Sequence, residues 1–359
     1  MRTSSIPPRT ILVTTANDHG AAVLNYAKVN RLIKDASGKV SGVEFEEIET
    51  GETLAVSSKA VINATGAFCD SVRQFAEPQA KPMIAPSQGA HLVFDRSFLP
   101  GGTAIMVPHT SDGRVMFAIP WHGHTLVGTT DTPVSSASLE PVPMEQEIEF
   151  ILSTAALYLH KKPTRADILS AFAGIRPLVK SGDGANTAAL SRDHTIHIDQ
   201  SGLLTITGGK WTTYRNMAED CVNQAATLAQ LTEKPCVTRD LPIHGHLRRT
   251  ARLGSLAVYG SDAPKVQQLV RADARLCERL HPALPYCGAE VVWAAREEMA
   301  RTVEDVLARR TRALFLNARA AIAMAPRVAE LMACELKCDR AWQELQITGF
   351  ERVAAQYAV

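Results

Sequence analysis

The sequence has no stretch of about 18 consecutive uncharged apolar residues, so it offers no candidate for a membrane-spanning helix. It also lacks an excess of charge of one sign. The 38 basic residues are balanced by 37 acidic ones, which excludes a global basic field, and we expect no nucleic-acid partner. What is present is an ordinary globular composition, 46% apolar and 21% charged, in a chain of 359 residues. This length is sufficient for two or three domains.

Cysteine pairs at metal-binding or redox spacing are missing as well. The seven cysteines are scattered and include no Cys-x-x-Cys pair, a pattern that favours reduced thiols in a cytoplasmic setting over disulfides. Cys334 and Cys338 lie four residues apart on a predicted helix. No histidine or second cysteine pair accompanies them, so we expect no metal site.

The first part of the chain predicts a three-stranded meander. Its extended segments are separated by short turns, and they cover residues 21–29 with 31–34, 40–48 and 53–56. After the meander, a short apolar strand that starts near Lys59 stops at Ala64-Thr65-Gly66. Small residues at such a place either allow a tight turn or let a large flat cofactor approach the backbone. The motif alone decides for neither interpretation.

The middle of the chain predicts one antiparallel sheet. Short alternating strands are separated by turns rich in Gly, Pro, Asp and Ser, and they cover residues 91–94, 104–107, 115–120 and 125–130. A helix over residues 144–159 is expected to cross this sheet. Pro143 precedes the helix, and Glu145 and Glu147 lie in its first turn, where carboxylates suit the helix dipole.

One charged residue, Arg176, stands in the otherwise apolar strand predicted over residues 170–179. A buried arginine is costly unless it meets an anion, which is either a nearby carboxylate or an anionic substrate. Arg192 has a carboxylate partner within reach, because Asp193 is the next residue. Both arginines remain candidates for a phosphate-bearing substrate, because the planar guanidinium binds phosphate through two parallel hydrogen bonds.

An apolar run, Leu203–Ile206, leads into Thr207-Gly208-Gly209-Lys210-Trp211-Thr212-Thr213 and then into a helix-like segment from Asn216. A strand that ends in glycines and turns into a helix presents backbone N–H groups that have no partner in the helix. Such groups suit an anion or the electron-rich edge of a ring. Lys210 adds a mobile cation at this turn.

The last third of the chain changes character. Residues 235–242 are a linker, and helices are predicted over residues 263–270, 289–298 and 319–334. We therefore expect a separate helical domain. A group of charged residues in it is interpreted as a solvated or interface face, and it consists of Arg301, Glu304, Asp305, Arg309, Arg310 and Arg312.

Six motifs are specific as a set: Val61-Ile62-Asn63-Ala64-Thr65-Gly66, Ser87-Gln88-Gly89-Ala90-His91-Leu92-Val93, Ile119-Pro120-Trp121, Gly128-Thr129-Thr130-Asp131-Thr132, Ile175-Arg176-Pro177-Leu178-Val179 and Thr207-Gly208-Gly209-Lys210-Trp211-Thr212-Thr213. In this order they resemble the FAD-dependent glycerol-3-phosphate dehydrogenases, which belong to the D-amino-acid-oxidase-like flavoproteins. The resemblance runs from about His19 to Phe350.

The resemblance implies an α/β plus α fold with three parts. These are a partial FAD-binding, D-amino-acid-oxidase-like domain, a substrate domain built on an antiparallel sheet, and a C-terminal helical domain. The expected boundaries are residues 1–78 and, for the return segment, 201–234 for the FAD-binding domain, 79–200 for the sheet domain, and 235–359 for the helical domain.

The implied reaction is the oxidation of sn-glycerol 3-phosphate to dihydroxyacetone phosphate, with hydride passing from C2 to FAD and the electrons onward to a quinone. The implied protein is cytoplasmic, with peripheral contact at the inner face of the cytoplasmic membrane. An amine or amino-acid oxidase of the same fold, or a non-catalytic remnant or subunit of such an enzyme, are the alternatives. The Ile-Arg-Pro-Leu segment at Arg176 and the helical domain favour the phosphate substrate.

The resemblance also implies roles for individual residues. Substrate binding falls to His91, Arg176, Arg192 and Lys210, and the catalytic candidates are His91, Arg176 and Lys210. Whether His91 or Lys210 is the general base stays open. The residues expected to line FAD are Thr65, Gly66, Gly209, Lys210, Trp211 and Thr212.

A Gly-x-Gly-x-x-Gly motif, which members of this family use to bind the ADP half of FAD, does not occur in this sequence. We therefore expect a truncated or misassigned chain, or else a short form that takes its pyrophosphate-binding half from another chain. On either expectation the chain alone binds FAD weakly and has little activity.

Overall fold

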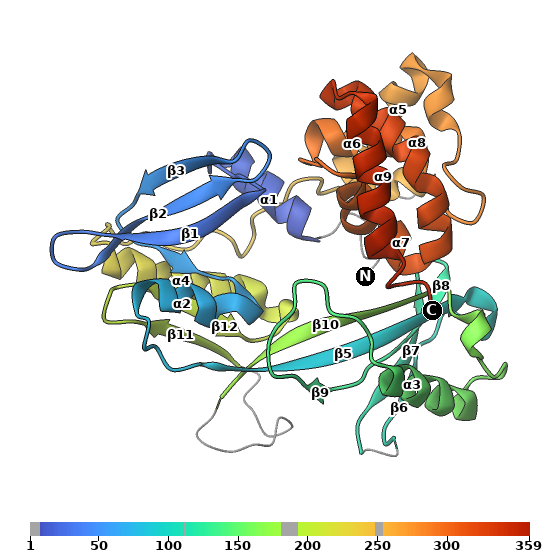
Figure 1. The fold of residues 1–359 in the computed structure, drawn as a ribbon, viewed down its shortest axis with the longest axis horizontal. Helices are drawn as coiled ribbons and strands as arrows, with labels where there is room; N and C mark the ends of the chain where they lie inside the picture. Colours follow the sequence, from blue (N-terminus) through green and yellow to red (C-terminus); the bar gives the residue numbers. More distant parts are fainter. Residues whose placement is uncertain (1–7, 111–112, 181–192, 248–253) are drawn as a thin grey trace.

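The computed structural model describes residues 8–110, 113–180, 193–247 and 254–359. It has three sheets and a helical region, here defined as residues 254–359 (Figure 1). The predicted meander is confirmed: β1 (Ala27–Lys34), β2 (Val40–Glu47) and β3 (Glu52–Ser57) pair in antiparallel register. The first strand is shorter than expected, because the chain turns at Tyr26 with a positive φ of 54°. A helix that the sequence did not predict, α1 (Pro8–Asp18), precedes it.

The predicted antiparallel sheet is also confirmed. Its strand order is β10-β5-β8-β7-β6, with β9 paired to β5, and its strands are β5 (Ile84–Asp95), β6 (Ile105–Val107), β7 (Met116–Trp121), β8 (His124–Gly128), β9 (Thr132–Pro133) and β10 (Ser170–Val179). One face of this sheet packs against α3 (Glu145–Tyr158), with Leu92 and Phe94 of β5 and Ile151 of α3 in a common core. The other face is therefore the one available for a site.

A third, smaller sheet contains the only parallel pair among the described strands. Its order is β11-β12-β4, with β11 (His194–Ile198), β12 (Leu204–Gly208) and β4 (Ile62–Asn63). Strands β12 and β4 run parallel. β4 continues through a 3-10 turn into α2 (Cys69–Ala76), and β12 continues in the same way into α4 (Tyr214–Leu228). A buried ion pair between Arg73 and Asp199, 2.7 Å long, fastens α2 to this sheet.

The helical region confirms the three predicted helices and adds to them. The helices are α5 (Ala263–Ala272), α6 (Gly288–Glu297), α7 (Ala313–Leu316), α8 (Ala318–Leu336) and α9 (Arg340–Ala354). Helices α6 to α9 share one apolar core, in which Val291, Leu314, Met324 and Phe350 are buried. Helix α5 packs in a second cluster, where Ala263 and Val266 meet Ala289 and Trp293 of α6. In Figure 1 this region stands over the end of the large sheet where α7 meets β8 and β10. Within the described residues, no helix combines the length and apolar character needed to cross a bilayer.

The charged group in the helical region is solvated only in part: the side chains of Arg301 and Arg309 are partly exposed, whereas those of Asp305 and Arg310 are largely buried. Asp305 is 4% exposed and accepts a hydrogen bond of 2.7 Å from the hydroxyl of Tyr26. The guanidinium of Arg310 donates two hydrogen bonds to the carbonyl of Glu298. Arg301 pairs with Glu49, which follows β2. The interface half of the prediction holds for Asp305 and Arg301, which join the helical region to Tyr26 and Glu49 at the meander.

Candidate active site

The two segments predicted to line FAD meet at one edge of the small sheet. Strands β4 and β12 are parallel neighbours, with Leu204 opposite Ile62, so their carboxyl ends lie side by side. Thr65 and Gly66 follow the first strand, and Gly209–Thr212 follow the second. Carboxyl ends of parallel strands are the usual location of nucleotide sites in such sheets.

Asn63 holds the first of these segments in place. Its amide donates to Oγ1 of Thr205 on the neighbouring strand and to the carbonyl of Cys69. Its carbonyl oxygen accepts from the hydroxyl of Thr65 at 2.7 Å and from the Thr65 N–H. The turn at Thr65 is therefore fixed by a buried side chain, and sequence reasoning did not single out Asn63.

Three glycines at this edge adopt the left-handed backbone conformation that other residues rarely adopt. Gly66 has a φ of +58°, and a Cβ built there would meet nothing within 4 Å. Gly208 and Gly209 have φ values of +76° and +73°, and a Cβ would come to 2.8 Å from Val179 and 2.6 Å from Met217. The space beside the backbone is thus empty at Gly66, whereas Val179 and Met217 fill it at Gly208 and Gly209. Trp211, half exposed, stacks on Tyr214 at 5.0 Å beside this opening.

Lys210 lies at the start of the 3-10 turn that follows β12, where its carbonyl accepts from the N–H and hydroxyl of Thr213. Its side chain is exposed and forms no ion pair with a described residue. The same turn abuts the end of β10, since a Cβ on Gly208 would contact Val179. The cation of Lys210 is therefore available at the junction between the small sheet and the strand that carries Arg176. Arg192 lies outside the described residues.

The open face of the large sheet carries the other predicted site residues. It displays alternate residues of two paired strands, which are Phe172, Gly174 and Arg176 on β10 and Ser87, Gly89 and His91 on β5. The middle of this face is a glycine pair, Gly174 opposite Gly89. The side chains of His91 and Arg176 therefore border a floor without side chains.

Arg176 folds back over this floor. A Cβ on Gly89 would lie 2.3 Å from Nη2 of Arg176, so the guanidinium occupies the space that glycine leaves. Nη2 donates to Oγ1 of Thr129 at 2.9 Å, and Nη1 is 3.5 Å from a carboxylate oxygen of Asp131. A third of the Arg176 side chain stays exposed, at 34%. Arg176 thus has a carboxylate partner, which is the first of the two interpretations that the sequence left open.

His91 sits between an aromatic ring and a glycine. Its ring stacks on Phe172, with centroids 5.4 Å apart and planes inclined by 14°. On the other side a Cβ on Gly128 would lie 2.4 Å from Cδ2 of His91. Burial, with a smaller contribution from the charge of Arg176, lowers the pKa of His91 to about 4. The imidazole is therefore neutral at physiological pH.

The structure brings His91 and Arg176 to one face of the large sheet and adds supports that the sequence did not indicate. Thr129 and Asp131 were noted only as part of a motif, and their contact with Arg176 crosses between strands. The signals that could have found the site are Gly89 and Gly128, because glycine inside a strand often marks a place where another group approaches the backbone.

Two family models match this chain. Residues 10–215 match the family model described as FAD dependent oxidoreductase, and residues 203–343 match the C-terminal domain of alpha-glycerophosphate oxidase. The chain belongs to the FAD-dependent oxidoreductase family and, within it, to the glycerol-3-phosphate dehydrogenases. The fold class expected from the sequence is thereby confirmed.

Among its relatives, a probable mitochondrial glycerol-3-phosphate dehydrogenase of Caenorhabditis elegans is 41% identical over 94% of this chain and 50% of the relative. The mitochondrial glycerol-3-phosphate dehydrogenase of Homo sapiens is 39% identical over 91% of this chain and 49% of the relative. The chain thus spans about half the length of these curated relatives. The structure of the glycerol-3-phosphate dehydrogenase from Bacillus halodurans complexed with FAD superimposes with a TM-score of 0.83, at 30% identity, over 98% of this chain and 72% of that one.

Proposed function

We propose that this chain provides the substrate site and the flavin-ring side of an enzyme that oxidises sn-glycerol 3-phosphate to dihydroxyacetone phosphate. The observation that carries the proposal is the placement of the Arg176 guanidinium over Gly89, on the same open face as the neutral imidazole of His91. Gly89 and His91 are two residues apart, about 7 Å along a strand. A small phosphate ester fits between two such groups.

In this proposal Arg176 binds the phosphate, with Arg192 as a second ligand. His91, uncharged before substrate arrives, is available to accept the proton of the C2 hydroxyl. A bound phosphate dianion offsets the charge of Arg176, which raises the pKa of His91 towards the value a base needs. Lys210 is the alternative base, or it stabilises negative charge as the hydroxyl proton leaves. FAD, when bound, accepts the two electrons.

The proposed FAD contacts are the backbone at Thr65 and Gly66 and the turn Gly209–Thr212. They are supported by the parallel pairing of β4 and β12 and by the open space at Gly66. The 3-10 turns that follow both strands lead into helices, so backbone N–H groups of both starts face the same edge. These groups favour electron density on a ring placed there.

We further propose the division into residues 1–78 with 201–234, 79–200 and 235–359. Strand β11 lies inside the second range but pairs with β12, so its sheet partners favour grouping it with the FAD-binding part. On the family resemblance alone we propose that the electrons pass to a quinone, and that the protein is cytoplasmic with peripheral membrane contact.

The test is reduction of an artificial dye by the purified protein with excess FAD, with glycerol 3-phosphate or an amino acid as substrate. We expect weak activity with the phosphate ester and none with the amino acid. Arg176→Ala should lower the activity by about tenfold to a hundredfold, because hydrogen bonds to a charged group contribute about 1.5–3 kcal/mol. Arg275→Ala, which removes an exposed arginine paired with Asp273, is the control. Unchanged activity in Arg176→Ala would overturn the proposal.

A further inference from the structure

The orientation of His91 depends on packing alone. Among the described residues, neither ring nitrogen of His91 has a hydrogen-bond partner. Its ring is confined by Phe172 on one side and by the backbone at Gly128 on the other. A histidine without a polar partner keeps one orientation only as long as its neighbours stay in place. What holds Phe172 therefore decides how precisely His91 is placed.

Phe172 is held by rings from the helical region. Phe315 of α7 meets it edge-to-face, with centroids 4.9 Å apart and planes at 88°. Tyr357, which follows α9, meets Phe315 in the same way at 5.5 Å and 86°. Phe172, Phe315 and Tyr357 are here called the aromatic column. Edge-to-face contact is a favoured geometry for aromatic pairs, so each ring restricts the orientation of the next.

The backbone next to Phe172 is tied to the same region. The hydroxyl of Ser170 donates to the carbonyl of Leu314 at 2.9 Å. The N–H of Ala318 donates to the carbonyl of Leu169, and the N–H of Ala171 donates to the carbonyl of Tyr357, both at 2.9 Å. Three hydrogen bonds thus fasten the start of β10 immediately before Phe172. The helical region sets both the strand and the ring against which His91 packs.

We propose that Phe315 and Tyr357 are positioning residues for His91, acting through Phe172. The column ends at a fixed point, because Tyr357 is 9% exposed and its hydroxyl donates to a carboxylate oxygen of Glu140. The helical region therefore contributes to the reaction by positioning His91 through Phe172. The catalytic part of this inference rests on the proposed function of His91, whereas the positioning part does not.

The positioning part is tested by NMR of the histidine ring signals, with His91 assigned by its absence in His91→Gln. In the unmodified protein we expect nuclear Overhauser contacts from the His91 ring to Phe172 and from Phe172 to Phe315. In Phe315→Leu and Tyr357→Leu we expect the titration midpoint of His91 to move towards its ordinary value by about half a unit or more, because a loosened ring gains contact with water. Tyr357→Phe keeps the ring and should leave the midpoint unchanged.

The control is Phe350→Leu, which removes a buried ring from the same helical core outside the aromatic column. It should lower the melting temperature without moving the His91 signal. An unmoved His91 midpoint in folded Phe315→Leu, or missing contacts from Phe172 to Phe315 in the unmodified protein, would overturn the inference. The contacts from Phe172 to Phe315 are measured in the unmodified protein, so the inference can be tested even if Phe315→Leu fails to fold.

Activity separates this inference from the proposed function. If both hold, Phe315→Leu lowers kcat about tenfold with KM for glycerol 3-phosphate nearly unchanged, since Arg176 is not part of the column. If His91 is positioned as proposed but does not act as the base, the NMR signal still moves while kcat of Phe315→Leu and of His91→Gln stays near that of the unmodified protein.

Discussion

At the scale of single residues, the candidate site is shaped as much by absent side chains as by present ones. Gly89 leaves the space that the Arg176 guanidinium fills, and Gly128 leaves the space beside the His91 ring. Both glycines lie in or at the end of strands of the same sheet, where any other residue would project onto the open face. Their substitution therefore acts directly on the proposed chemistry.

Gly128→Ala should displace His91. The added methyl group would lie 2.4 Å from Cδ2 of His91 and 2.9 Å from the carbonyl oxygen of Ala90, and the latter is backbone that moves little. We expect a destabilisation of about 1–3 kcal/mol, as for other overpacked sites, and a larger loss of kcat than of thermal stability. Gly102→Ala, where a Cβ meets nothing within 4 Å, is the control. An active Gly128→Ala with an unmoved His91 signal would contradict this account.

At the scale of elements, α3 is anchored by one buried carboxylate. Glu147 is 2% exposed and accepts hydrogen bonds from the Gln88 amide and from the hydroxyls of Thr130 and Thr132. It also accepts from the N–H of Met144. The sequence placed Glu147 in the first turn for its effect on the helix dipole. Its larger role, tying the helix to β5 and to the segment after β8, depends on residues distant in the chain.

Glu147→Ala is expected to cost about 3–5 kcal/mol, because it leaves several buried donors without an acceptor. Glu145→Ala, two residues earlier in the same turn, removes an exposed carboxylate paired with Arg165 and should cost less than about 1 kcal/mol. Urea unfolding of both variants measures the difference. Equal stabilities would mean that the Glu147 network contributes little.

A second element, α6 with the residue that follows it, should make stability depend on pH. Burial raises the pKa of Glu298 to about 7, well above its ordinary 4.5. The folded state then binds a proton that the unfolded state has lost, so this group's contribution is complete below pH 4.5 and disappears as pH rises through 7. Glu298 accepts a hydrogen bond from Nε1 of Trp293. The side-chain oxygen of a glutamine at this position would accept the same hydrogen bond.

We therefore expect Glu298→Gln to unfold at higher urea concentration than the unmodified protein at pH 8, by an amount of order 2 kcal/mol, and to match it near pH 4.5. Glu297→Gln changes the neighbouring exposed carboxylate and should leave the pH profile as it is. If the urea stabilities of Glu298→Gln and of the unmodified protein change with pH in parallel, Glu298 is already ionised well below pH 7.

The sequence predicts those features of the structure whose causes lie within a few neighbouring residues, and it misses those that depend on contacts between distant residues. The alternation around Leu92 and Phe94 predicted the sheet, and the glycines after Thr207 predicted the strand-to-helix turn, because both signals lie within a few residues. Helix α1 was missed because its apolar residues form no clear stripe. Asp305 was misassigned as solvated because its partner Tyr26 is 279 residues away. The Arg176 contact with Asp131 was likewise hidden until the strands were paired.

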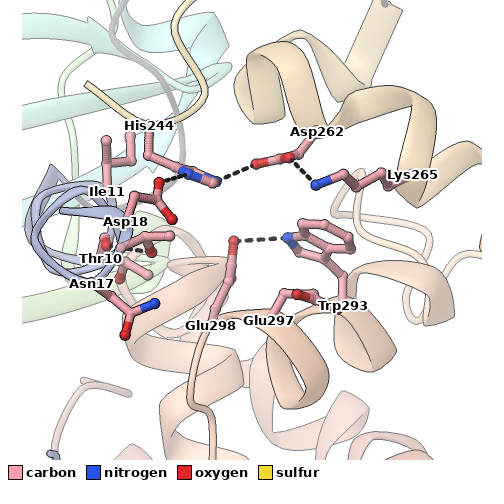
Figure 2. Close-up of a pocket in the computed structure, with 11 residues that line it drawn as sticks. Thr10, Ile11, Asn17, Asp18, His244, Asp262, Lys265, Trp293, Glu297 and Glu298 are labelled. Atoms are coloured by element: carbon pink, nitrogen blue, oxygen red, sulfur yellow. Dashed lines mark hydrogen bonds and ion pairs between the residues drawn. The ribbon is translucent and has the colours of Figure 1, made fainter. Parts of the chain in front are cut away.

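At the scale of the whole molecule, α1 is joined to the helical region through His244. Figure 2 shows the His244 ring between two carboxylates, with Nδ1 2.7 Å from Asp18 and Nε2 2.6 Å from Asp262. Lys265 forms an ion pair with Asp262 on the far side. These groups line a cavity of about 240 Å³ whose floor includes Trp293 and Glu298. His244 thus bridges Asp18 of α1 and Asp262 just before α5, and Ile11 of α1 packs against the same apolar cluster as α5.

Burial alone would lower the pKa of His244, but the hydrogen bonds to Asp18 and Asp262 raise it above its ordinary 6.5. The stabilisation is therefore complete below pH 6.5 and lost as pH rises through the higher value in the folded state. We expect hydrogen exchange in α1 to be slow at pH 6 and to increase at pH 9 beyond the intrinsic effect of pH. In His244→Gln exchange should be fast at both. His246→Gln, which changes a nearby histidine without these bonds, is the control.

The hydrogen bond between Ala171 and Tyr357 has a consequence for synthesis on the ribosome. A chain that emerges from its amino end must complete all of α9 and reach Tyr357 before Ala171 of β10 gains this hydrogen bond. Until then the sheet face that carries His91 and Arg176 lacks the wall provided by the helical region. Contacts so distant in the sequence slow folding and leave apolar strands exposed in the meantime. Nascent chains released before residue 357 should therefore depend most strongly on chaperones.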